Sequence, residues 1–400
     1  MINHQPRRCV QIAGREMFKI THTIACAAAM ALASPVLADQ GVDQTSVRFA
    51  QVAALDGPAA ALGTGMRQGL LAAFNEANLA GGVHGRTLEL TSMDDGYEPS
   101  RSIEAVTSVI KSDDYLALIG TVGTPTTKAT QPLATAANLP LIGPFTGAGF
   151  LRDPALSNVV NMRATYDAET QAWVDYLVDD LGLNNIAILY QDDGFGRVGL
   201  SGVNKALEAR GMTLSAEGTY TRNTLAVKSA LLEIRKAEPE AIVMVGAYKP
   251  LAEFIKLSKK MKMDPVFVTI SFVGSKALAA ELGEAGDGVI VSQVVPQPWD
   301  ASLPVVAAYQ AAMKTFDANE EPGFVSLEGY ITGRLAIQAL ENAGADVTRA
   351  GYLEALSGLG TIDLGGMALS YGPGDNQGSD SVFLTRIRAD GSFEAMMPGS

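Results

Sequence analysis

Apolar residues gather in short continuous runs, and longer stretches with helical spacing of apolar positions separate these runs. Such runs are typical of strands buried on both faces of a parallel sheet, and the longer amphipathic stretches are typical of the helices that cover it. We predict strands at 116–120, 140–143, 184–190, 212–218, 241–246, 266–270 and 288–294. Helices are predicted between them at 124–138, 168–181, 198–210, 225–237, 250–263 and 276–282. The pattern indicates the α/β class, with mostly parallel sheets flanked by helices.

The last hundred residues have a different pattern. Helices are predicted at 301–319, 323–343 and 348–356, followed by hairpin-like strands at 367–371 and 382–388. A chain of 400 residues is too long for one ordinary core. We therefore expect two α/β lobes, with a chain that crosses between them more than once.

The segment from Val47 to Asp95 is the most specific part of the sequence. It predicts a strand, a Gly57-Pro58 loop, an amphipathic helix, a glycine-rich turn at 81–85 and a second strand. Ligands bind beyond the carboxyl ends of the strands in an open parallel sheet, and the N–H groups of a helix N-terminus there attract anions. Gly and Pro can also serve only to make a tight turn, and the loop alone does not separate these interpretations.

This segment resembles the opening of type I periplasmic ligand-binding proteins, the branched-chain amino-acid-binding group of ABC importers. The shared features are the GPxAxxG loop, the turn Asn78, Gly81, Gly82, Val83 and Gly85, and the acidic pair Asp94 and Asp95. The resemblance implies a two-lobed, non-catalytic receptor that closes over a small amino acid or related carboxylate and delivers it to a membrane permease. It also implies a monomer, with lobe one at 42–162 plus 296–366 and lobe two at 163–295 plus 367–400.

A hydroxyl-rich loop at 120–127 follows a predicted strand and opens a predicted helix. Thr124 can cap that helix, and the same position can direct a hydroxyl at a carboxylate. The resemblance implies that Thr124 binds the ligand carboxylate, with Thr126 as a neighbouring candidate. It implies further ligand contacts at Phe145, Thr146, Phe195, Tyr248 and Phe272. Additional candidates are Gly57, Tyr97, Tyr166 and Ser271. Arg163 is expected to form ion pairs between the lobes or at the hinge.

The loop at Ser271 and Phe272 departs from the resembled family. Amino-acid binders of that group often have an acid here that pairs with the ligand ammonium, whereas this chain has Ser271. An unpaired ammonium in a closed, dry cleft is costly. Either the ligand lacks an α-ammonium, or another acid such as Asp56, Asp192 or Glu328 takes that role.

Glycines 194, 196 and 199 match the G-x-G-x-x-G pattern of dinucleotide-binding turns. Asp192 and Asp193 precede them and have the wrong charge sign for a pyrophosphate neighbour. These charges disfavour nucleotide binding. The resemblance implies that Phe195 packs against the ligand, and packing at the start of the helix is the alternative.

Residues 24–38 form an apolar run that ends in Val-Leu-Ala, which predicts an export signal cleaved near Ala38 and a periplasmic location. The alternative is a buried N-terminal helix, and Met17 is an alternative start. Cleavage would remove both cysteines and two of three histidines. It would also remove four of the 30 basic residues and one of the 43 acidic residues, so the mature chain would have a net charge of −16. Such a charge disfavours nucleic acid as a partner.

The rival hypotheses are an exported α/β enzyme and a ligand-sensing domain. His84 would be the single histidine of the mature chain, and no cysteine would remain, which excludes a Cys-His pair and a His-rich metal site. The chain also lacks a G-x-S-x-G elbow. We expect no catalytic residue, no metal and no cofactor. A site built only from carboxylates, or a metal site with oxygen ligands, remains the alternative.

Overall fold

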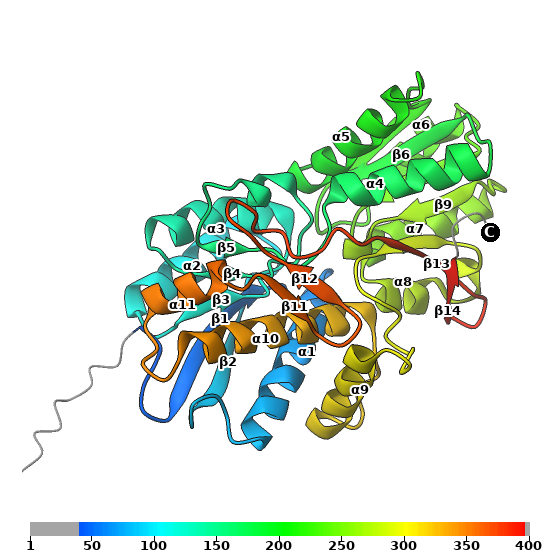
Figure 1. Cartoon of the computed structure of the whole chain (residues 1–400). Helices are drawn as coiled ribbons and strands as arrows, with labels where there is room; N and C mark the ends of the chain where they lie inside the picture. Colours follow the sequence, from blue (N-terminus) through cyan, green and yellow to red (C-terminus); the bar gives the residue numbers. More distant parts are fainter. Residues whose placement is uncertain (1–39, 397–400) are drawn as a thin grey trace, which may run out of the picture. The chain divides into compact units, whose positions relative to one another are not determined.

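Two mostly parallel sheets form the framework of the protein in a computed structural model, which describes residues 40–396 (Figure 1). Both sheets belong to one compact unit. The predicted export signal and the two cysteines lie outside the described residues. Among the residues that are described, no helix combines the length and the apolar character needed to span a membrane.

The first sheet has the strand order β2-β1-β3-β4-β5, and all of its pairings are parallel. Its strands are β1 (Ser46–Ala53), β2 (Thr87–Asp94), β3 (Ala117–Ile119), β4 (Leu141–Ile142) and β5 (Val159–Val160). Successive side chains of β1 point to opposite faces. Val47 and Phe49 therefore belong to one apolar core, and Ala50 and Val52 belong to another.

Helices cover both faces of the first sheet. The helices α2 (Pro99–Ser112) and α3 (Thr124–Ala136) pack together, and α1 (Ala60–Leu79) packs against α9 (Pro304–Phe316) and α10 (Phe324–Ala343). The helix α11 (Arg349–Ser357) packs on α10. A Cβ added to Gly69 would lie 1.9 Å from the Ser326 carbonyl oxygen, so glycine permits the close approach of α1 and α10.

The second sheet has the order β14-β13-β10-β9-β8-β6-β7. Its parallel strands are β6 (Ile186–Gln191), β7 (Ala216–Tyr220), β8 (Ala241–Val245), β9 (Val266–Thr269) and β10 (Ile290–Gln293), and its antiparallel edge is β13 (Phe383–Ile387) and β14 (Phe393–Met396). The helices α4 (Tyr166–Val174) and α5 (Gly194–Glu208) pack together. A second group comprises α6 (Lys228–Arg235), α7 (Tyr248–Lys260) and α8 (Ser275–Leu282).

The chain passes between the two sheets at 161–165, 294–303 and 371–382. Backbone hydrogen bonds join the first and third of these connections, with Asn161 N donating to Asn376 O at 2.8 Å and Gly378 N donating to Asn161 O at 2.9 Å. The expectation of more than one crossing is therefore confirmed. These connections bring the loops of both sheets into contact.

The predicted hairpin of strands 367–371 and 382–388 is wrong in its pairing. The strand β12 (Ala368–Ser370) pairs with β11 (Thr361–Asp363) in a separate sheet, whereas β13 pairs with β10 and β14. Both segments alternate in polarity, and polarity alone does not select a partner. The prediction also omitted α2, β5, β11 and β14, and it missed the π-helical turn at Asp175–Asp180 that ends α4.

Candidate ligand-binding site

Loops at the carboxyl ends of strands from both sheets meet and supply most of the predicted residues. Tyr97 follows β2, Phe145 and Thr146 follow β4, Phe195 follows β6, and Phe272 follows β9. Parallel strands place these ends on one edge of each sheet, which is where α/β proteins bind ligands. The site is therefore built from the topology of the two sheets.

Two buried threonine hydroxyls face each other on the first sheet. The Thr124 and Thr146 Oγ1 atoms are 2.7 Å apart, and the two side chains are almost fully buried. The loops are held together because Gly123 N donates to Phe145 O at 3.2 Å and Phe145 N donates to Thr121 O at 2.7 Å. The structure thus places Thr124 beside Thr146.

The helix α3 begins beside this hydroxyl pair without a side-chain cap. Its N-cap residue is Gly123, at φ 101°. Thr124 therefore does not cap α3, which corrects one of the two roles considered for it. Thr126 instead donates its hydroxyl to the Gly123 carbonyl at 2.9 Å, and so stabilises the first turn.

Five aromatic rings form a continuous buried cluster next to the threonines. The Phe272 ring centroid lies 4.7 Å from that of Phe195, 5.2 Å from that of Phe145 and 5.9 Å from that of Tyr97. The Tyr166 ring lies 5.4 Å from that of Phe195. Rings from loops of both sheets therefore form one buried apolar cluster, and Phe272 lies at its centre.

Tyr166 links the aromatic cluster to the hydroxyl pair. Burial raises the pKa of its hydroxyl, while Arg163 and the hydroxyls of Thr146 and Thr124 oppose that rise. The hydroxyl nevertheless has no hydrogen bond of acceptable geometry to any described residue. A buried donor without a partner is costly, so this hydroxyl is available to a ligand acceptor.

A buried ionic network lies behind the rings. The guanidinium of Arg163 is 3.1 Å from Glu169 and 3.5 Å from Glu328, and these three side chains are at most 4% exposed. Arg163 also donates to the Ser271 hydroxyl. Ion pairing at Arg163 is thereby confirmed, and Ser271 belongs to this network.

The charges in this network change one another's pKa values. Burial raises the pKa of Glu328 to about 7, and the charge of Arg163 opposes the rise. Burial lowers the pKa of Arg163, but Glu328 and Glu169 outweigh it, and the net change is upward. Arg163 therefore stays cationic.

Polar contacts between strand-end loops also join the two sheets, and they were not expected from the sequence. Arg222 after β7 pairs with Glu98 after β2 at 2.8 Å and with Asp193 at 2.8 Å. Asn223 donates to Glu98 at 2.7 Å and to the Gly96 carbonyl at 3.0 Å. The available signal was the presence of opposite charges directly after predicted strands on both sheets.

Two predicted ligand contacts, Tyr248 and Gly57, are not part of the ring cluster. The Tyr248 hydroxyl, from the second sheet, accepts a long 3.4 Å hydrogen bond from Ala61 N at the start of α1. Gly57 has φ 78° in an exposed turn, and a Cβ added there would meet no atom within 4 Å. Gly57 is thus a turn residue in this arrangement, whereas Tyr248 joins the two sheets.

Comparison with known proteins agrees with this geometry. A family model described as "Periplasmic binding protein" matches residues 46–392. The chain belongs to the periplasmic binding protein family.

Named relatives extend over most of the chain. A leucine-, isoleucine-, valine-, threonine- and alanine-binding protein of Pseudomonas aeruginosa is 21% identical over 340 residues, covering 83% of this chain and 89% of its own length. The crystal structure of a possible leucine/isoleucine/valine-binding protein from Rhodopirellula baltica is 37% identical with a TM-score of 0.84, covering 90% of this chain and 97% of that one. A fatty acid ABC transporter substrate-binding protein from Thermomonospora curvata is 21% identical with a TM-score of 0.80, covering 89% and 92%, and shares the fold.

Residues considered for nucleotide binding and for catalysis make contacts within the fold. In this periplasmic binding protein fold, the Asp193 carboxylate accepts from Phe195 N at 2.9 Å and so caps α5, where a dinucleotide phosphate would bind. The His84 ring nitrogen lies 3.3 Å from the Leu340 carbonyl and 3.2 Å from the Glu341 carbonyl. Across residues 40–396, no three His, Cys, Asp or Glu side chains are grouped closely enough to hold a metal ion.

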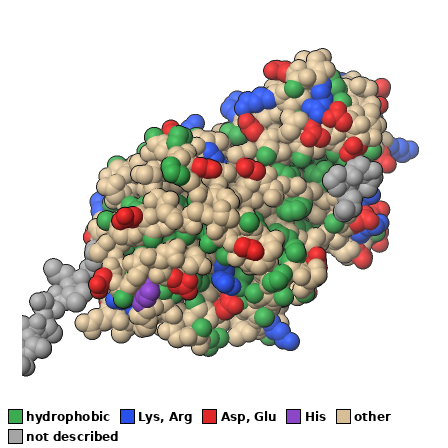
Figure 2. Space-filling view, viewed as in Figure 1, with side chains coloured by type: hydrophobic (Ala, Val, Ile, Leu, Met, Phe, Trp, Pro, Cys, Tyr) green, Lys and Arg blue, Asp and Glu red, His purple; other side chains and the backbone are tan. Residues whose placement is uncertain are grey.

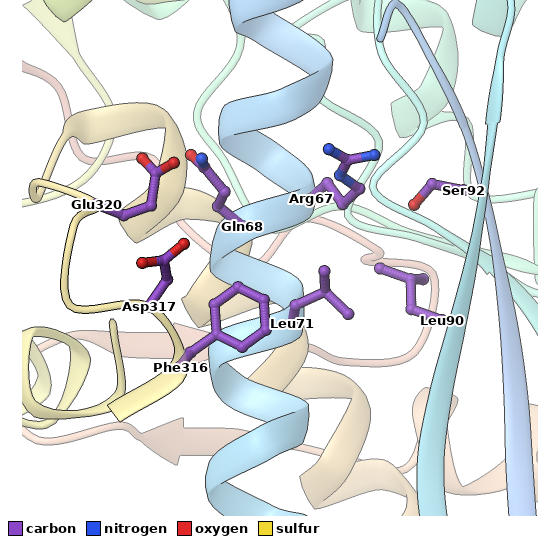
Figure 3. A pocket seen from close by; sticks show the side chains of 8 residues that line it. All are labelled: Arg67, Gln68, Leu71, Leu90, Ser92, Phe316, Asp317 and Glu320. Carbon is purple, nitrogen blue, oxygen red and sulfur yellow. The ribbon is translucent and has the colours of Figure 1, made fainter. Parts of the chain in front are cut away.

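A pocket of about 400 Å³ lies elsewhere on the surface (Figure 3). Side chains from α1, β2 and the end of α9 line it: Arg67, Gln68, Leu71, Leu90, Ser92, Phe316, Asp317 and Glu320. None of them comes from the second sheet, and none is a predicted ligand contact. The face in Figure 2 carries scattered side chains of both charges among uncharged atoms. Our candidate site is the aromatic and hydroxyl cluster, because loops of both sheets meet there.

Proposed function

We propose that the protein is an extracytoplasmic receptor that binds a small carboxylate-bearing solute and delivers it to the permease of an ABC transporter. The observation that carries this proposal is the buried pair of Thr124 and Thr146 hydroxyls beside the uncapped start of α3. Hydroxyl and N–H donors at a helix N-terminus suit a carboxylate. The adjoining rings suit an apolar body.

Family membership supports the receptor class but leaves the ligand open. The name of one relative refers to leucine, isoleucine, valine, threonine and alanine, and the name of another refers to a fatty acid ABC transporter. All of these ligands carry a carboxylate, which agrees with the hydroxyl pair. We propose a small amino acid or a related carboxylate as the ligand class.

We further propose that the two sheets belong to two lobes that open and close. Lobe one would comprise 42–162 plus 296–366, and lobe two would comprise 163–295 plus 367–400. Contacts of Arg222 with Glu98 and of Tyr248 with Ala61 would then belong to the closed form. A ligand stabilises that form only through its higher affinity for it. We propose a monomer that is exported by the signal at 24–38 and performs no catalysis.

A thermal-shift screen with the chain from residue 39 onward tests the proposal. Apolar carboxylates and amino acids are compared with the matching primary amides. A ligand at 100 times its dissociation constant should stabilise the protein by about 2.7 kcal/mol. We expect carboxylates to raise the melting temperature, and stabilisation by the amides alone would contradict a carboxylate receptor.

A variant pair locates the site. Thr124→Val should reduce the shift to about half at the same ligand concentration, because the loss of one hydroxyl of the pair weakens binding about tenfold. Thr315→Val is the matched control, since Thr315 is exposed on α9 and its hydroxyl donates to the Ala311 carbonyl. An equal shift in both variants would place the ligand elsewhere.

A further inference from the structure

We infer that the ligand is an apolar monocarboxylate without an ammonium group, because the guanidinium of Arg163 already occupies the cation position between the acids of the site. This inference rests on the proposed function and specifies its ligand class. The inference predicts that carboxylates without an amino group bind more tightly than the corresponding amino acids.

Arg163 has the surroundings that a ligand ammonium would need. Its charged end lies between the carboxylates of Glu169 and Glu328, at 3.1 and 3.5 Å. Its Cζ atom lies 5.1 Å from the Phe145 ring centroid and 5.7 Å from that of Tyr166. Carboxylates and ring faces are the groups that stabilise a buried cation. In this protein they stabilise a side chain of the chain itself.

Glu169 has no remaining capacity for a second cation. Its carboxylate accepts from Arg163 Nη2 at 3.1 Å, from Ser271 N and Ser271 Oγ at 2.9 Å each, and from Ser292 Oγ. A carboxylate offers about four lone-pair sites. Four donors therefore use the acceptor capacity of Glu169.

The acids on the neighbouring strand-end loops also have partners or lie in solvent. The Asp94 carboxylate accepts hydrogen bonds from the N–H groups of Leu55, Asp56 and Gly96. The Asp95 carboxylate accepts from Tyr97 N and from the Ser102 hydroxyl. Glu98 accepts from Arg222 and Asn223, and Asp193 accepts from Arg222. Asp56 and Asp192 are exposed, and Asp192 pairs with Arg197. Two of the three substitutes considered from the sequence are thus unsuited to a buried ammonium.

Glu328 is the remaining substitute. It is 3% exposed and lies 3.5 Å from Arg163. An ammonium that reached Glu328 would stand next to the guanidinium, and two like charges would share one carboxylate in a dry site. Such a placement is costly.

Buried groups of the site that can donate are left without a hydrogen bond. Nε of Arg163 and the hydroxyl of Tyr166 have no hydrogen-bond partner among the described residues, whereas Nη1 of Arg163 faces Glu328 at 3.5 Å. Spare donors fit a ligand that only accepts, such as a carboxylate. An ammonium would add three further donors and no acceptor. The rings around Phe272 provide an apolar surface for the body of the ligand.

Matched ligand pairs test the inference by isothermal titration calorimetry. One pair is 3-phenylpropanoate and phenylalanine, and the other is 4-methylpentanoate and leucine, with further apolar monocarboxylates and their α-amino counterparts. We expect the amino-free member to bind at least about tenfold more tightly, because it leaves no buried ammonium unpaired. Tighter binding of the amino acids would overturn the inference and leave the carboxylate receptor intact. Binding of no pair member would overturn both.

Substitutions at Arg163 and Glu328 identify the groups responsible. Arg163→Gln frees Glu169, and we expect it to reduce the preference for the amino-free member about tenfold. If Arg163→Gln fails to fold, the double variant Arg163→Gln with Glu328→Gln replaces it. The second substitution removes an acid that would otherwise be buried without a cation. Glu281→Gln, at an exposed position on α8, is the control. Tight amino-acid binding by the wild type that Glu328→Gln abolishes would assign Glu328 to a ligand ammonium and refute the inference.

Discussion

Glu328→Gln should change the pH dependence of stability. Glu328 is 3% exposed, and burial raises its pKa from 4.5 to about 7, although the charge of Arg163 opposes the rise. Glutamine has nearly the same shape and does not titrate. The variant therefore removes the proton equilibrium while it keeps the packing.

The direction of the change in stability with pH follows from the raised pKa of Glu328. The native state binds the Glu328 proton more tightly than the unfolded state, so the stabilising contribution is fully present below pH 4.5 and is lost as the pH rises through 7. The difference between 4.5 and about 7 corresponds to about 3 kcal/mol in the free energy of unfolding. We expect the wild type to lose about that much relative to Glu328→Gln between pH 4 and pH 8.

Urea unfolding in steps of about half a pH unit measures this difference. Glu281→Gln serves as the control, because Glu281 is exposed on α8. Equal denaturant slopes for all three proteins would show that compactness is unchanged. A stability difference between the wild type and Glu328→Gln that stays constant over this range would refute the reasoning.

Thr146→Val should weaken carboxylate binding about tenfold in calorimetry, because a hydrogen bond to a charged group contributes about 1.5–3 kcal/mol; unchanged affinity would remove Thr146 from the site. Gly123→Ala should destabilise the protein by at least about 1–3 kcal/mol in urea unfolding. Its Cβ would lie 2.2 Å from Tyr97 Cε2 at φ 101°, and a neutral effect would contradict this packing. Arg222→Gln should weaken binding modestly, by about 0.2–1 kcal/mol, and make the affinity less dependent on salt, because the ion pair with Glu98 is partly exposed. An unaltered salt dependence would show that this pair does not stabilise the ligand-bound form.

Most elements of the fold could be predicted because their signals are local. The continuous apolar run of β8 and the helical spacing of α7 lie close to their predicted positions at 241–246 and 250–263. The pairing of β12 and β13 was wrong because their alternating polarity fits any half-buried edge. The short strand β5 has two residues, which is too few for a periodic signal.

Part of the candidate site could also be predicted. Phe145, Thr146 and Phe272 follow strands, and strand-end loops of parallel sheets bind ligands, so their positions were expected. The ion pair of Arg222 and Glu98 was missed, because charged loop residues have no pattern that identifies a partner 124 positions away.

The sequence by itself determined the α/β class, the order of most strands and helices, and the resemblance that family membership confirmed. It also revealed that Ser271 stands where an acid was expected. Only the tertiary structure decided that Arg163, Glu169 and Glu328 share one buried network and that Phe272 lies among rings from both sheets. The physical reason is that periodicity reports which face of an element is buried, whereas the meeting of two strand-end loops depends on how the chain crosses between the sheets.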